Sequence, residues 1–201
     1  MQVKKLILIQ IIISFSFCSV AQSNDWKRAS NEDGIQAYTR KVSGSKYLEY
    51  KIETQISTTI EGAINLITDT KKYKLIFPYL SKVELLKNNT EDSYDVLVVI
   101  NTPFPARDRI GVYTNQINRS DNEATIQISQ NTNLIPDSKY VKIKECYGSW
   151  NLKKINEDQI FVSHTFFADP GGTIPPFIIN AFALKQPMKT FRIIRKTLES
   201  R

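Results

Sequence analysis

The stretch PPFIINAFALKQPMKTFRIIRKTLE, residues 175–199, decides the fold that we predict for this chain. Two prolines open it, and proline suits the first turn of a helix because the backbone N–H groups there have no helical partner. Apolar residues then recur every three or four positions, which is the spacing of one helical face. At 1.5 Å per residue the predicted helix is about 37 Å long, with a kink expected at Pro187.

This helix carries two stripes of side chains. At about 100° per residue, an apolar stripe is formed by Phe177, Ala181, Leu184, Met188, Phe191 and Leu198. A basic stripe runs beside it and consists of Lys185, Lys189, Arg192 and Lys196. The basic stripe predicts either a docking surface for an anionic membrane or a solvated face whose charge complements the helix dipole.

Ahead of the helix, the sequence predicts eight strands. The clearest is 47–56, where every second residue belongs to one largely apolar set: Leu48, Tyr50, Ile52, Thr54 and Ile56. Such alternation is typical of an antiparallel strand with one solvated face. The other predicted strands cover 35–41, 82–88, 94–100, 107–118, 123–130, 139–154 and 159–168.

Two short helices are predicted after the second strand. Thr58 and Glu61 have the spacing of a capping box, and apolar residues follow at helical spacing up to Ile67. A second short helix is predicted over 70–77, because Pro78 cannot continue it.

A long amphipathic helix that follows antiparallel strands can bury its apolar face on the concave side of a curved sheet. The sequence therefore predicts an α+β helix-grip fold with one domain over residues 22–201. A sheet that grips one helix can leave an internal cavity suited to a hydrophobic ligand. This prediction rests on the architecture, since any single residue of the apolar stripe is better explained as core. The candidate ligand-binding residues are Tyr50, Ile52, Asp108, Ile126, Ile128, Val141, Ile143, Phe177, Ala181, Leu184, Met188 and Phe191.

Four stretches in order along the chain carry a family resemblance. They are Asp33–Ile35 with Tyr38–Arg40, Pro103–Arg109, Tyr140–Ile143 with Gly148–Leu152, and Asp169–Pro175 followed by Asn180 and Pro187. In order and spacing they resemble the START domain (the StAR-related lipid-transfer domain) of the wider helix-grip, or Bet v 1-like, superfamily. The resemblance implies a lipid or sterol-like ligand in a tunnel beneath the last helix, without identifying that ligand.

Few residues are available for catalysis. His164 is the only histidine, and the pattern favours a hydrogen-bonded residue of the sheet over a catalytic one. Asp108 shares a strand face with Ile110, which predicts either a contact to the polar head of a ligand or a structural ion pair. Glu145 is a similar but weaker candidate. The sequence predicts no metal site, no cofactor and no catalytic residue.

The first 21 residues resemble a secretory signal peptide. Lys4 and Lys5 precede an apolar run over 6–17, and small residues lead to a cleavage site near Ala21. An uncleaved anchor and lipidation at Cys18 are the alternatives. The predicted location is the periplasm or the cell exterior. The formal charge of the whole chain is +7, and removal of the two lysines with this segment leaves +5, a mild excess.

These observations predict an exported protein that binds a hydrophobic small molecule or lipid, for transfer or for sensing. Two alternatives remain, namely a helix-grip enzyme of cyclase or aromatase type and an interaction domain without a cavity. The enzyme would need an acid or base in the pocket, for which Asp108, Glu145 and His164 are the candidates. Nucleic-acid binding is not predicted, because the basic residues are spread through the chain and no known module is present.

Overall fold

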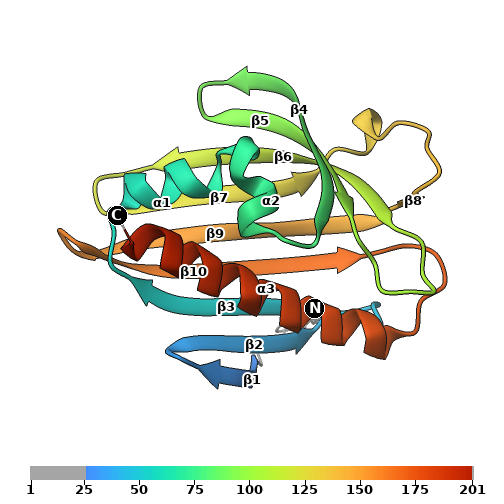
Figure 1. The fold of residues 1–201 in the computed structure, drawn as a ribbon, viewed down its shortest axis with the longest axis horizontal. Coiled ribbons are helices and arrows are strands. Elements are labelled where there is room, and N and C mark those ends of the chain that lie inside the picture. The colour runs from blue at the N-terminus through green and yellow to red at the C-terminus, as the bar shows by residue number, and fades with distance from the viewer. Residues whose placement is uncertain (1–25, 201) are drawn as a thin grey trace, which may run out of the picture.

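The computed structural model describes residues 26–200. In these residues ten strands form one curved sheet, and the helix α3 (Pro176–Glu199) lies across one face of it (Figure 1). The predicted helix-grip fold is confirmed. The predicted signal segment, residues 1–21, lies outside the described residues.

The strands follow the chain as a series of antiparallel neighbours. The order across the sheet is β1-β2-β3-β10-β9-β7-β6-β5-β4, and β8 pairs with β6 in parallel. Their bounds are β1 Lys27–Glu32, β2 Ile35–Lys41, β3 Leu48–Ile56, β4 Leu80–Thr90, β5 Ser93–Ile100, β6 Arg109–Arg119, β7 Glu123–Gln130, β8 Val141–Lys142, β9 Glu145–Asn156 and β10 Gln159–Asp169.

The structure differs from the predicted strands in two places. The edge strand β1 was not predicted, because it lacks an apolar face and all but one of its residues are exposed. The predicted strand over 139–154 is broken at Ile143 and Lys144 into β8 and β9. Because of this break, the residues of β9 that face inward are not those expected from one continuous strand, which changes the candidate residues of the site.

Short helices connect β3 to β4, as predicted. Helix α1 spans Ile60–Ile67, and a 3-10 turn over Thr70–Lys72 leads into the single turn of α2, Tyr73–Ile76. The N-cap of α1 is Thr59, whose hydroxyl accepts the N–H of Gly62 at 3.0 Å. The predicted cap at Thr58 is therefore wrong by one residue.

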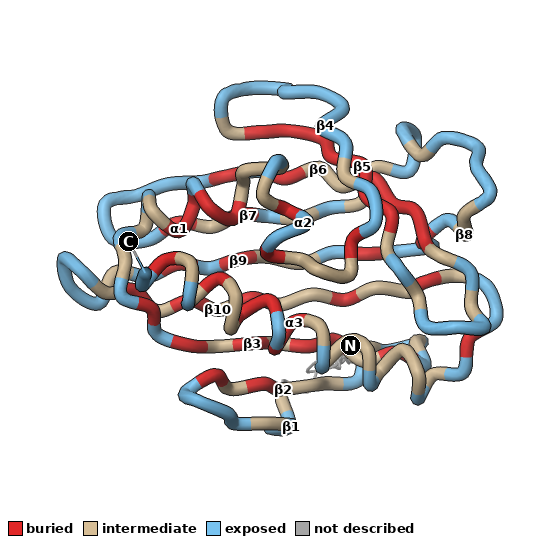
Figure 2. Tube along the Cα trace, in the orientation of Figure 1, coloured by how far each residue is buried: buried red, intermediate tan, exposed pale blue. Residues whose placement is uncertain are grey.

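The main core lies between the concave face of the sheet and the helices, where buried residues gather along the inner strands (Figure 2). Trp150 on β9 is stacked on Phe191 of α3, with ring centroids 5.3 Å apart. A second, smaller cluster lies on the opposite face of β5 and β6, covered by the segment before β8: Leu97, Val99, Ile110 and Val112, with Ile135 and Tyr140 against them. Both faces of β5 are thus buried.

Gly148 on β9 has no room for a side chain beside β10. A Cβ atom added there would lie 2.5 Å from the carbonyl oxygen of Thr165 and 2.6 Å from the ring of Phe166. Since backbone cannot move aside as a side chain can, we expect Gly148→Ala to lower the free energy of unfolding by about 1 to 3 kcal/mol. Urea unfolding checks this. A Gly148→Ala protein as stable as the wild type would contradict the steric explanation.

Candidate ligand-binding cavity

A cavity of about 170 Å³ lies beneath the N-terminal half of α3. Its floor is the concave face of the sheet, with Val96 and Val98 from β5 and Ile128 from β7. Its roof includes Ile179 and Ala183 of α3. Because nearly all of the wall is apolar, water gains little there and an apolar ligand can displace it. An apolar cavity of about 150 Å³ already accepts benzene, so a full lipid requires the roof to move outward.

Aromatic rings close the side of the cavity between α2 and α3. Tyr73 contacts Phe77 at a centroid distance of 5.3 Å, and Phe77 contacts Tyr79 at 6.0 Å. Tyr79 in turn meets Phe182 of α3 at 6.0 Å. All four residues line the cavity. The segment after α1 and the C-terminal helix therefore meet through an edge-to-face pair, a contact that can open without breaking the sheet.

The face of α3 that lines the cavity is not the predicted one. Phe177 is 72% exposed and Ala181 is also exposed, so the predicted stripe is wrong in the first two turns. The cavity is instead lined by Ile179, Phe182, Ala183, Gln186 and Pro187. Further along, Met188, Phe191 and Leu198 are buried as expected. The residues of α3 that face the core and those that face the cavity lie about a quarter turn apart around the helix. The apolar stripe predicted from the sequence coincides only with the core face.

The other predicted ligand-binding residues fall into two groups. Tyr50, Ile128 and Ile143 line the cavity. The rest of the apolar set packs around it as core: Ile52, Ile126, Leu184, Met188 and Phe191. These residues support the side chains that line the cavity. Contact of any residue of the predicted set with a ligand stays a prediction.

The structure places Arg109 at the cavity, whereas Asp108, the predicted candidate, lies outside it. Asp108 does not line the cavity; its Oδ1 accepts the N–H of Thr102 at 3.1 Å in the loop before β6. Ile110, predicted to share its face, belongs to the second cluster on the other side of the sheet. The inward residues of β6 are therefore Arg109, Tyr113 and Asn115, all of which line the cavity. The sequence predicted a strand here with alternating faces, but it did not indicate which of the two faces points inward.

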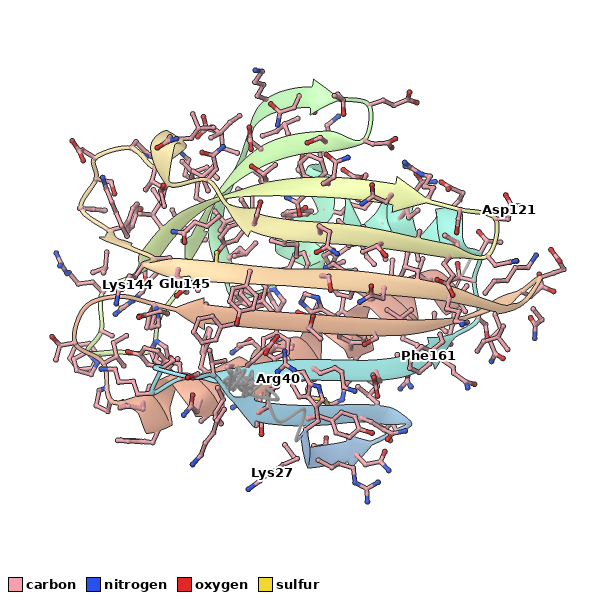
Figure 3. The ribbon with its side chains drawn as sticks, turned by 180° about the vertical axis from the view of Figure 1, so that it is seen from behind. Lys27, Arg40, Asp121, Lys144, Glu145 and Phe161 are labelled. Carbon is pink, nitrogen blue, oxygen red and sulfur yellow. The ribbon has the colours of Figure 1, made fainter. Side chains whose placement is uncertain are left out.

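The break between β8 and β9 moves Val141 and Glu145 out of the site. Val141 pairs with Arg109 at the start of β6 and is not part of the cavity wall. Ile143 points inward, but after the break Cys146 is the next buried residue, so Glu145 lies on the outer face (Figure 3). Of the three acid or base candidates, only His164 borders the cavity.

His164 is held by two hydrogen bonds and a stacked ring. Its Nδ1 lies 3.0 Å from the carbonyl oxygen of Ser149, and its Nε2 lies 3.1 Å from the hydroxyl of Tyr50. Because a carbonyl only accepts, Nδ1 carries the proton and Nε2 accepts from Tyr50. Trp150 stacks on the imidazole at 3.9 Å. Burial lowers the pKa of His164 to about 4, so the ring is neutral at pH 7.

This lowered pKa makes stability depend on pH. The unfolded chain has a histidine pKa of about 6.5 and binds a proton between pH 6.5 and 4, where the folded protein does not. The free energy of unfolding is therefore expected to fall by about 2 kcal/mol from pH 7 to pH 5. Urea unfolding at both pH values measures the fall, and His164→Gln should lose most of it. An equal fall in the variant would assign the effect to other groups.

Two polar atoms of β6 are buried at the cavity without a hydrogen-bond partner. They are the hydroxyl of Tyr113 and Nδ2 of Asn115. The thiol of Cys146 lies near enough to Tyr113 to affect the pKa of both groups, but it does not reach hydrogen-bond geometry. An unpaired buried polar atom costs about 1 to 3 kcal/mol. A ligand oxygen that paired with these donors would recover part of that free energy.

The predicted membrane-docking residues lie on the surface of α3. Lys185, Lys189 and Lys196 are exposed, whereas Arg192 is paired with the carboxylate of Glu32 on β1. Membrane docking stays a prediction. None of the helices in the described part of the chain is long and apolar enough to cross a membrane. Within residues 26–200 no three His, Cys, Asp or Glu side chains gather closely enough to hold a metal ion.

The curved sheet, the gripped helix and the apolar cavity define a helix-grip domain. Comparison with solved structures indicates which kind of helix-grip domain the chain is similar to. A StAR-related lipid transfer protein of Xanthomonas axonopodis is 26% identical, with a TM-score of 0.78 over 86% of this chain and 98% of that one. Human StAR-related lipid transfer protein 5 has a TM-score of 0.76 at 11% identity, covering 90% of this chain and 89% of its own. The resemblance to START domains is confirmed.

Other comparisons are less specific. The ZhuI aromatase/cyclase of Streptomyces sp. R1128 has a TM-score of 0.55 at 14% identity, over 76% of this chain and 94% of that one. An uncharacterised protein of Pseudomonas aeruginosa is 26% identical over 93% of both chains. No protein-family model matches the chain. The fold is thus shared by lipid transfer proteins and by an enzyme. The choice between binding and catalysis therefore has to be argued from the residues of the site.

Proposed function

We propose that this domain binds a hydrophobic small molecule, a lipid or a sterol- or isoprenoid-like compound, in the cavity beneath α3. The observation that carries the proposal is the apolar cavity of about 170 Å³ between the sheet and the helix. The likeness to lipid transfer proteins supports it. Binding serves transfer or sensing, and the edge-to-face contact of Tyr79 with Phe182 is the part of the wall that would open.

We propose binding without catalysis. Asp108 and Glu145 lie away from the cavity, and His164 is neutral with both ring nitrogens already hydrogen-bonded. A general acid or base needs a pKa near the working pH and an accessible proton, and His164 has neither in this arrangement. This favours a binding protein over an enzyme of cyclase or aromatase type. If His164→Gln retained ligand affinity but abolished turnover of a bound compound, the enzyme alternative would be correct.

Native mass spectrometry of the chain without its first 21 residues tests the binding function directly, with organic extraction of whatever co-purifies. A stoichiometric adduct of lipid or isoprenoid character is the expected result and would give the ligand class. A protein that carries no adduct and ignores a broad panel of lipids would overturn the proposal and favour an interaction domain.

Export is proposed on the sequence pattern of residues 1–21 alone. Lys4 and Lys5, the apolar run and the small residues before Ala21 support cleavage by a signal peptidase. Cell fractionation and N-terminal sequencing of the mature chain test it. A mature chain that starts at Gln22 is the expected result, whereas a lipidated Cys18 or an intact Met1 would overturn it.

A further inference from the structure

Arg109, the first residue of β6, is a buried cation at the cavity. Its side chain lines the wall and the residue is only 4% exposed. The guanidinium donates to three backbone carbonyls: Nε to Pro170 at 3.4 Å, Nη2 to Gly171 at 3.2 Å, and Nη1 to Arg107. Two of these carbonyls belong to the loop that leads from β10 into α3. The cation therefore lies where the strand floor meets the entry of the roof helix.

Within residues 26–200 Arg109 makes no ion pair with a carboxylate. Asp108 is adjacent in sequence and favours the cation electrostatically, but its Oδ1 contacts the N–H of Thr102 and it forms no salt bridge with Arg109. Burial lowers the pKa of Arg109, and the nearby Tyr47 and Asp108 only partly oppose that shift. A buried charge without a directly paired counter-ion is unfavourable, so a ligand that brings a negative charge gains free energy here.

Unused donors remain around the guanidinium. Arginine has five N–H groups, and the three carbonyls account for three of them. Tyr47, close enough to interact electrostatically with Arg109, has a buried hydroxyl without a hydrogen-bond partner. The cavity wall thus offers two N–H donors on a cation, and the Tyr47 hydroxyl near that cation lies outside the wall. A planar group with two anionic oxygens matches this set.

We propose that Arg109 binds the carboxylate head group of an amphiphilic acid whose apolar part occupies the cavity. This rests on the proposed binding of an apolar ligand and adds the chemistry of its head. A carboxylate is favoured over a phosphate because only two N–H donors remain on the cation, and the rest of the cavity wall offers uncharged donors such as Tyr113 and Asn115. The head would lie beside the carbonyls of Pro170 and Gly171, at the start of the loop into α3.

Competition binding tests the head group. N-phenyl-1-naphthylamine, an uncharged fluorescent probe, is displaced by dodecanoate, by its methyl ester or by dodecyl phosphate. Dodecanoate is expected to displace the probe at about 10- to 100-fold lower concentration than the methyl ester, the factor of a charge-assisted hydrogen bond in a buried site. Arg109→Gln should remove this preference, so that dodecanoate and the methyl ester displace the probe at similar concentrations. Arg109→Lys, which keeps the charge but not the fork, should retain part of it.

The control is Arg107→Gln, because Arg107 is exposed and its side chain does not line the cavity. Equal affinity of the wild-type protein for dodecanoate and the ester would overturn the head-group proposal and leave apolar binding intact. So would equal losses in Arg107→Gln and Arg109→Gln, or tighter Arg109-dependent binding of dodecyl phosphate. Failure of the probe and all three amphiphiles to bind would overturn the proposed function itself. If Arg109→Gln does not fold, the wild-type preference and Arg109→Lys decide.

Discussion

Replacing Trp150 by alanine is expected to lower the free energy of unfolding by about 3 to 5 kcal/mol. Trp150 is 2% exposed and belongs to the main core. Its indole stacks on His164 at 3.9 Å and on Phe191 of α3 at 5.3 Å. It therefore joins β9, β10 and the helix in one stack, and truncation leaves a hole that rigid strands cannot close. Urea unfolding monitored by circular dichroism measures the change.

Phe177→Ala is the comparison for this variant. Phe177 is also aromatic, but it is 72% exposed on the first turns of α3, so its loss should change the free energy of unfolding by less than about 0.5 kcal/mol. A Trp150→Ala protein that unfolds at nearly the wild-type urea concentration would show that the stack does not hold α3 to the sheet. A large loss in Phe177→Ala would mean that the outer end of the helix is covered in solution.

The second large effect concerns ligand binding. Ala183→Phe is expected to weaken binding of N-phenyl-1-naphthylamine by about tenfold or more, because Ala183 lines a cavity of only about 170 Å³. The added ring would occupy space that the ligand needs. It can also overpack the roof, with a loss of about 1 to 3 kcal/mol in stability, so unfolding is measured on the same protein.

Ala181→Phe is the matched control, since it places the same ring two residues away on the exposed side of the helix. It should leave the affinity within about twofold of wild type, as for a surface change remote from the ligand. Affinity lost in Ala181→Phe but kept in Ala183→Phe would contradict the observed orientation of α3 and would support the face predicted from periodicity. Equal affinity in both variants and the wild type would place the probe elsewhere on the protein.

The polar residues that line the cavity were the hardest part of the site to predict from the sequence. Asp108 was predicted either to contact a ligand or to form an ion pair, because it shares a strand face with Ile110, and that apolar face was expected to point inward. Ile110 and Val112 point instead into a second cluster beneath Ile135 and Tyr140. A strand with apolar residues on both faces does not say which face is inside, since the period of two is the same for either choice.

The sequence by itself determined the architecture. The period of two in the strands, the period of 3.6 in residues 175–199 and the turns between them reflect local backbone geometry, which each segment carries within itself. Long-range contacts decided the rest. The segment before β8 covers the outer face of β6 and turns Arg109 inward, and the break after Ile143 turns Glu145 outward. The rotation of α3 over the sheet makes Ala183, rather than Ala181, the roof of the cavity. Such choices depend on which surfaces meet, and no single segment contains that information.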